Sequence, residues 1–162
     1  MGSDVSGGYS PSILNAIQNA SIAAKALSFK KELRHPHNHD NSHFANRPFS
    51  IATLLYLATV GGAAVCNIEE HVGSFGPGKS FDALLVNVGG GVNPALWGMN
   101  VLVTSRHGIA DASVNGDIGL KEKQKVVNGW LESFLHGGDD RNIEKVYVQG
   151  RFVGGRKFPS RA

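Results

Sequence analysis

The chain has 162 residues, of which 41% are hydrophobic and 18% are charged, as expected for a globular protein with one sizeable core. Sixteen Lys and Arg against thirteen Asp and Glu give a formal charge of +3, and these charges are scattered along the chain. This charge pattern argues against a nucleic-acid-binding protein.

Cysteine content and hydropathy indicate the compartment. The single cysteine, Cys66, excludes an intramolecular disulfide, fits a reducing compartment and is expected to be a small buried side chain. The longest apolar run, residues 51–66, is interrupted by polar residues and glycines and falls short of the roughly 20 residues that a membrane helix needs. No signal peptide is recognisable, so we expect a cytoplasmic protein that does not contact the membrane.

The first predicted helix begins near Pro11. Ser10 can cap it, proline suits a first helical position, and apolar residues recur at spacings of three and four as far as Leu27. Residues 34–48 follow, rich in His, Asn, Asp and Pro and without apolar periodicity. This segment is interpreted as a polar surface insert.

A second helix and a strand come next. Ser50 can cap the helix, which is expected to break or end at Gly61 and Gly62 before a short helical continuation. A turn-rich segment then leads into the apolar run 81–88, which has the length of a buried strand. Asp82, close to the start of that strand, is predicted to be a turn or cap residue.

Residues 89–121 form a predicted irregular insert that opens with three glycines, with a short strand at 101–103 as its one candidate element. A phosphate-binding loop would need a Lys and a Ser or Thr after the glycines, and these are missing. Residues 122–136 have an apolar helical stripe that the following Gly137 and Gly138 should end.

The last part of the chain is predicted to be a β-hairpin. Apolar triplets flank Gln149 and Gly150, a pair that can make a two-residue turn because glycine tolerates positive φ. The preceding Asp139, Asp140 and Arg141 could be a catalytic group, but we expect them to organise the loop before the hairpin through side-chain to backbone hydrogen bonds.

Three segments carry a resemblance to a known family. Residues 2–10, Gly-Ser-Asp-Val-Ser-Gly-Gly-Tyr-Ser, and residues 138–143, Gly-Asp-Asp-Arg-Asn-Ile, resemble the guanine deaminases of the amidohydrolase superfamily, fungal ones included. Residues 72–83 are similar to the return segment of many amidohydrolases. The resemblance covers nearly the whole chain apart from the two inserts.

The resemblance implies an α/β fold: the C-terminal remnant of an amidohydrolase (β/α)8 barrel, with the strand 8 region and the helices after it, plus part of a composite β-sandwich. Residues 1–66, with the polar insert 34–48, would be the end of the barrel. Residues 67–162 would hold the return segment of the sandwich, the insert 89–121, the helix 122–136 and the terminal hairpin.

The resemblance also implies a site residue. Asp4 would stand at the C-terminal end of the eighth strand, the face on which barrel enzymes carry their chemistry. It would be both a metal-site residue and a catalytic one, taking a proton from a water that Zn²⁺ has made more acidic. From its position alone, an acidic residue so close to a chain end would simply be solvated.

The other zinc ligands of the family, a His-x-His pair and single histidines on earlier strands, have no counterpart ahead of Asp4. Two spacings in the polar insert do spell His-x-His, but the polar surroundings differ from the apolar strand that fixes the family's pair, so the metal role is not carried over to them. The histidines concerned are His35, His37, His39 and His43. The chain alone is therefore expected to be inactive.

The implied function is zinc-dependent hydrolytic deamination of guanine to xanthine and ammonia, by an enzyme that is a homodimer in the family, with this chain as an incomplete part of it. Two alternatives stay open. One is an amidohydrolase that acts on C–N bonds of a different purine or of a triazine, and the other is a non-catalytic oligomerisation module.

Overall fold

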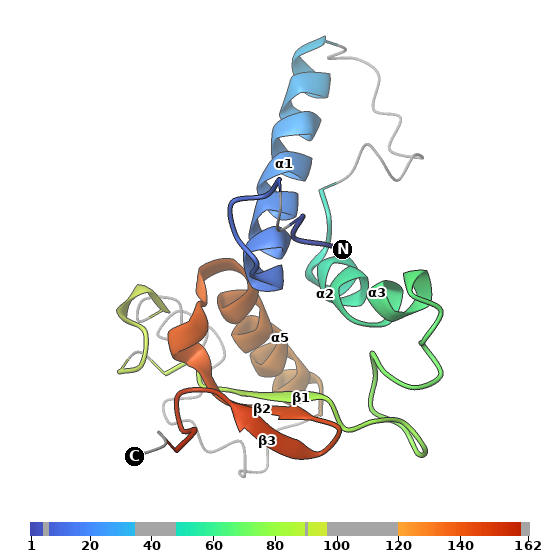
Figure 1. Cartoon of the computed structure of the whole chain (residues 1–162). Helices are drawn as coiled ribbons and strands as arrows, with labels where there is room; N and C mark the ends of the chain where they lie inside the picture. Colours follow the sequence, from blue (N-terminus) through green and yellow to red (C-terminus); the bar gives the residue numbers. More distant parts are fainter. Residues whose placement is uncertain (5–6, 35–47, 90, 97–119, 160–162) are drawn as a thin grey trace. The chain divides into compact units, whose positions relative to one another are not determined.

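The computed structural model describes residues 1–4, 7–34, 48–89, 91–96 and 120–159. It divides into two compact units, Met1–Gly76 and Pro77–Ala162, whose elements are shown in Figure 1. Within the described residues, no helix combines the length and apolar character needed to cross a membrane. The expected strand at 101–103 lies outside the described residues.

The first unit is helical and opens with α1, Ile13–Arg34. The Ser12 hydroxyl accepts a hydrogen bond from the Asn15 backbone N–H at 3.3 Å, as an N-terminal cap does. The helix therefore begins two residues later than predicted and extends seven residues beyond Leu27. Ile17 and Ser21 are buried on one face, whereas Ile22 is exposed.

The second helix, α2 (Ile51–Ala58), is capped by the Ser50 hydroxyl, which accepts from the Thr53 N–H, so this prediction is confirmed. The predicted break at the two glycines is wrong. The helix ends at Ala58, because the backbone of the next residue, Thr59, leaves helical geometry at φ −122°, ψ −96°. The Thr59 hydroxyl donates to the Leu55 carbonyl at 2.7 Å. The glycines lie inside α3, Val60–Val65.

The second unit contains an antiparallel sheet in the order β1–β2–β3, visible in Figure 1. Its strands are β1 (Ala83–Val86), β2 (Ile143–Val148) and β3 (Arg151–Gly154). The predicted strand 81–88 is thus real but shorter. The register shifts between Leu85 and Val86, which face Lys145 and Ile143, so Glu144 is the extra residue of a β-bulge.

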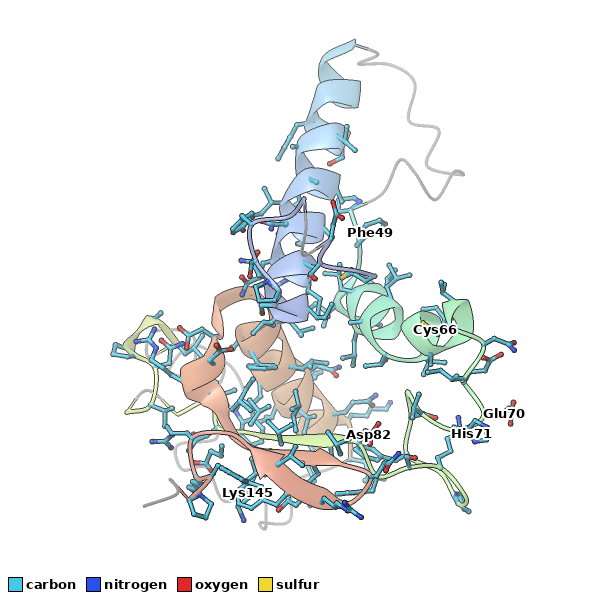
Figure 2. The ribbon with its side chains drawn as sticks, in the orientation of Figure 1. Phe49, Cys66, Glu70, His71, Asp82 and Lys145 are labelled. Atoms are coloured by element: carbon cyan, nitrogen blue, oxygen red, sulfur yellow. The ribbon has the colours of Figure 1, made fainter. Side chains whose placement is uncertain are left out.

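The predicted hairpin turn is confirmed. Gln149 and Gly150 have φ values of 49° and 75°, as a two-residue type I′ turn requires. The turn is held to the segment before β1, because the Gly150 N–H donates to the Phe81 carbonyl and the Gln149 N–H donates to the Asp82 carboxylate at 2.7 Å. Asp82, labelled in Figure 2, thus binds the backbone of the hairpin turn, 67 residues further along the chain.

Aromatic rings follow one another across the sheet. Their centroids are 5.7 Å apart between Phe81 and Tyr147, 5.6 Å between Tyr147 and Phe152 and 5.2 Å between Phe152 and Phe158. The Lys145 ammonium, labelled in Figure 2, lies 5.6 Å from the Phe152 ring centroid. The two outer rings are 52% and 44% exposed, so this aromatic row is only partly covered.

A long helix and two short ones complete the second unit: η2 (Pro94–Leu96), α5 (Leu120–Gly137) and η3 (Asp140–Asn142). The end of α5 agrees with the predicted glycine stop. Helix α5 contacts η2, and Leu96, Val126 and Leu135 are buried.

Candidate functional site

Asp4, the predicted site residue, lies in a turn ahead of α1. Its backbone is left-handed, with φ 50°, and its side chain is exposed. The Asp4 carbonyl oxygen accepts the N–H groups of both Gly7, at 2.9 Å, and Gly8. Two backbone donors on one carbonyl make a tight reverse turn that presents the aspartate at its start.

Both sides of this turn are attached to helices of the first unit. After the turn, the Tyr9 hydroxyl accepts from the Asn19 amide at 3.0 Å, on α1. Before it, the nitrogen of Met1 donates to the Leu57 carbonyl at 3.1 Å, on α2. The segment that carries Asp4 is therefore held by hydrogen bonds to two of the helices of the first unit, α1 and α2.

The donor set around Asp4 does not fit a zinc centre. A catalytic Zn²⁺ is held by about three protein ligands. Within residues 1–4, 7–34, 48–89, 91–96 and 120–159, no three side chains of His, Cys, Asp or Glu are grouped so that they could hold a metal ion. Asp4 would be a single ligand there. The described residues of the chain therefore cannot hold the ion by themselves.

Other candidate ligands stand apart from Asp4 in the chain. Figure 2 shows Cys66, Glu70 and His71 at and after the end of α3. Cys66 is exposed, which corrects the expected buried thiol: it follows the last residue of α3, Val65, which is itself 86% exposed. The histidines of the polar insert, His35, His37, His39 and His43, lie outside the described residues.

Asp139, one of the two aspartates before the hairpin, has a structural role, as predicted. The Asp139 carboxylate accepts the Arg141 N–H at 2.9 Å and caps η3. The Arg141 guanidinium also lies against it, with Nη2 2.6 Å from Oδ2. The side-chain hydrogen bond from Arg141 is the main reason that the pKa of Asp139 is lowered.

A buried polar cluster in the second unit was not predicted. Asn93 and Asn142 have no solvent exposure, and the Asn93 amide donates to the Asn142 side-chain oxygen at 2.9 Å. Asn142 also accepts from the Asp139 N–H at 3.1 Å and donates to the Asn87 carbonyl at 2.7 Å. The side-chain nitrogen and oxygen of both Asn93 and Asn142 therefore have hydrogen-bond partners, as in a polar network that stabilises the fold.

Glu144, the bulge residue, extends this cluster. Its Oε1 accepts from the Asn87 amide at 3.0 Å and lies 3.1 Å from Arg156 Nη2, and its Oε2 lies 2.7 Å from Lys157 Nζ. The Lys157 hydrogen bond, followed by the one from Asn87, lowers the pKa of Glu144 to about 2. Asn87, Arg156 and Lys157 are 57, 12 and 13 residues away, so no local sequence pattern indicated them.

Comparison with known proteins identifies relatives over almost the full chain. The model of the amidohydrolase family matches residues 1–153. A probable guanine deaminase from Schizosaccharomyces pombe is 33% identical over 155 residues, which are 96% of this chain and 23% of that protein. The guanine deaminase of Rattus norvegicus is 32% identical over 153 residues, 94% of this chain and 27% of that protein.

Solved structures agree on the fold. A guanine deaminase from Bradyrhizobium japonicum superposes with a TM-score of 0.69 at 20% identity, over 96% of this chain and 30% of that one. The guanine deaminase of E. coli gives 0.58 at 25% identity, over 96% of this chain and 27% of that one. The chain thus has a mixed helix and strand structure like part of these proteins, and it spans about a quarter of the length of the curated relatives it matches.

Proposed function

We propose that this chain, which belongs to the amidohydrolase family, is the C-terminal part of a zinc-dependent guanine deaminase. The reaction is the hydrolytic deamination of guanine to xanthine and ammonia. The observation that carries the proposal is the match over 94% to 96% of the chain to proteins named guanine deaminases, within which the Asp4 segment lies.

The order of the elements supports this placement. Residues 1–66 would supply the end of a (β/α)8 barrel, with α1 as the helix after the eighth strand. Residues 1–4 have no regular secondary structure here, which fits a strand that forms only between two neighbours in a closed barrel. Residues 67–162 would supply one side of the β-sandwich, and the partly exposed aromatic row of the sheet is the face that the rest of the sandwich would cover.

Asp4 is the one catalytic residue that we assign to this chain. Its exposed carboxylate would accept the proton of the attacking water. When bound, Zn²⁺ supplies the acidity of that water. The remaining zinc ligands would come from other parts of the longer protein, which we expect to be a homodimer.

A chimera tests the proposal. The matched segment of the Schizosaccharomyces pombe relative, aligned over 155 residues, is replaced by this chain, and loss of guanine absorbance and release of ammonia are followed. We expect activity in the chimera and its loss by about 1,000-fold in Asp4→Asn, within the usual contribution of a positioned proton acceptor of about 10² to 10⁴.

The matched control is Asp140→Asn, another exposed aspartate, which should keep the activity of the parent chimera. A folded, zinc-loaded chimera that releases no ammonia from guanine would overturn the proposal. Turnover of another purine or of a triazine in its place would show that the chain belongs to a different amidohydrolase.

A further inference from the structure

We propose that Gly7 and Gly8 are positioning residues that set the backbone and the carboxylate of Asp4. The inference rests on the proposed function for its catalytic consequence.

Gly8 fixes the backbone of the turn. A Cβ at position 8 would lie 2.8 Å from the Asp4 carbonyl oxygen and closer still to the Ser3 carbonyl oxygen. Both obstacles are backbone atoms, so they cannot move aside as a flexible side chain would. The Gly8 N–H also donates to the Asp4 carbonyl, and this hydrogen bond needs the same close approach. A side chain at position 8 would therefore open the turn.

Gly7 leaves the space that the carboxylate occupies. A Cβ at position 7 would lie 2.8 Å from Asp4 Oδ2 and 3.5 Å from Cγ. Here the obstacle is the end of a side chain that can rotate away. A substitution at Gly7 would redirect the carboxylate while the turn persists.

The two glycines act on a residue whose conformation needs support. Asp4 has a φ of 50°, in the left-handed region that is uncommon for residues other than glycine but is more accessible to Asp than to most. The hydrogen bonds from positions 7 and 8 to the Asp4 carbonyl hold this geometry. Misplacing a reacting group by about 1 Å can cost about 100-fold in rate.

Three variants of the full 162-residue chain separate these roles: Gly8→Ala, Gly7→Ala and the control Gly2→Ala. Gly2 lies two residues before Asp4, and no described atom is within 4 Å of a Cβ placed there. The measurements are the carbon chemical shifts of Asp4 and the amide exchange rate at position 8, neither of which needs zinc or activity.

We expect Gly8→Ala to shift the Asp4 backbone resonances and accelerate exchange at position 8. Gly7→Ala should move only the side-chain resonances of Asp4, and Gly2→Ala should move neither. Unchanged Asp4 resonances in Gly8→Ala, with a folded α1, would overturn the inference.

The same variants in the chimera test the catalytic consequence. Gly8→Ala should lower kcat by about 100-fold with an unchanged KM, because Asp4 acts on the attacking water in the transition state and does not bind the base. Gly7→Ala should lower kcat by a smaller factor. Full kcat in Gly8→Ala would disprove the positioning role. If instead the parent chimera is inactive, but the variants of the 162-residue chain give the expected spectra, the proposed function alone is refuted.

Discussion

The Nζ atom of Lys157 lies 2.7 Å from Oε2 of Glu144, and this ion pair fastens the segment after β3 to the start of β2. The backbone repeats the connection, because the Lys157 N–H donates to the Glu144 carbonyl at 2.9 Å. The Glu144 side chain is only 9% exposed and also contacts Arg156 and Asn87. The Glu144 carboxylate therefore connects the segments that follow β1 and β3 to the bulge of β2.

The Glu144 contacts predict how stability depends on pH. Its pKa falls from the ordinary 4.5 to about 2 in the folded chain. A lowered folded-state pKa stabilises the fold above pH 4.5, and this contribution is lost as the pH falls from 4.5 toward 2. We expect Glu144→Gln to be less stable than the parent at neutral pH and the difference to shrink across that range.

Urea unfolding of the parent and of Glu144→Gln at several pH values between 6 and 2 checks this. The difference between the two curves isolates Glu144 from other carboxylates, including Asp139, whose pKa is also lowered. A difference that is constant across the range would contradict the assigned cause.

Asp82 stabilises the hairpin turn through the Gln149 N–H, 2.7 Å from its carboxylate. Asp82→Ala should cost about 1 kcal/mol, the usual value of a lost side-chain to backbone hydrogen bond. Asp82→Asn keeps an acceptor oxygen and should cost less. Asp140→Ala is the control, because among the described residues the Asp140 side chain has no hydrogen bond or ion pair, and it should change stability by no more than about 0.5 kcal/mol.

Local signals were readable in the sequence because they depend on neighbours in the chain. The Ser50 cap, the Gln149 turn and the capping role of Asp139 all involve partners within three residues. The helix break was misplaced because glycine only weakens a helix, whereas the Thr59 hydroxyl competes for the helical carbonyl of Leu55.

Long-range polar contacts were not readable. Asn93 and Asn142 are 49 residues apart and belong to no periodic pattern, so nothing in the sequence indicated that they meet in the interior. The candidate site shows the same division: the motif around Asp4 indicated the family, but its left-handed backbone and the contacts of Gly8 follow only from the folded turn.

The Asn142 cluster predicts a large cost for its removal. Asn142→Ala would remove this partner from the buried Asn93 amide and from the partly buried Asp139 N–H and Asn87 carbonyl. We expect a loss of about 3 kcal/mol in the free energy of unfolding, measured by urea denaturation. The matched control is Asn128→Ala on the exposed side of α5, which should be neutral or slightly stabilising because Ala is the better helix former. Equal free energies of unfolding for Asn142→Ala and Asn128→Ala would contradict the prediction, because they would mean that water replaces the Asn142 hydrogen bonds at no cost.

The hairpin turn offers a stabilising change. Gln149 has a φ of 49°, a conformation that Asn adopts more readily than Gln, and Asn-Gly is the preferred pair of a type I′ turn. Gln149→Asn should therefore raise the free energy of unfolding by about 0.5 kcal/mol, within the range of compatible turn substitutions. Gly150→Ala, at a φ of 75°, should lower it by about 1 kcal/mol. Gln124→Asn on the exposed face of α5 serves as the control and should cost a few tenths of a kcal/mol, because Asn is the weaker helix former. If Gln149→Asn is destabilising by thermal and urea unfolding alike, then residue 149 does not have the left-handed backbone on which this turn depends.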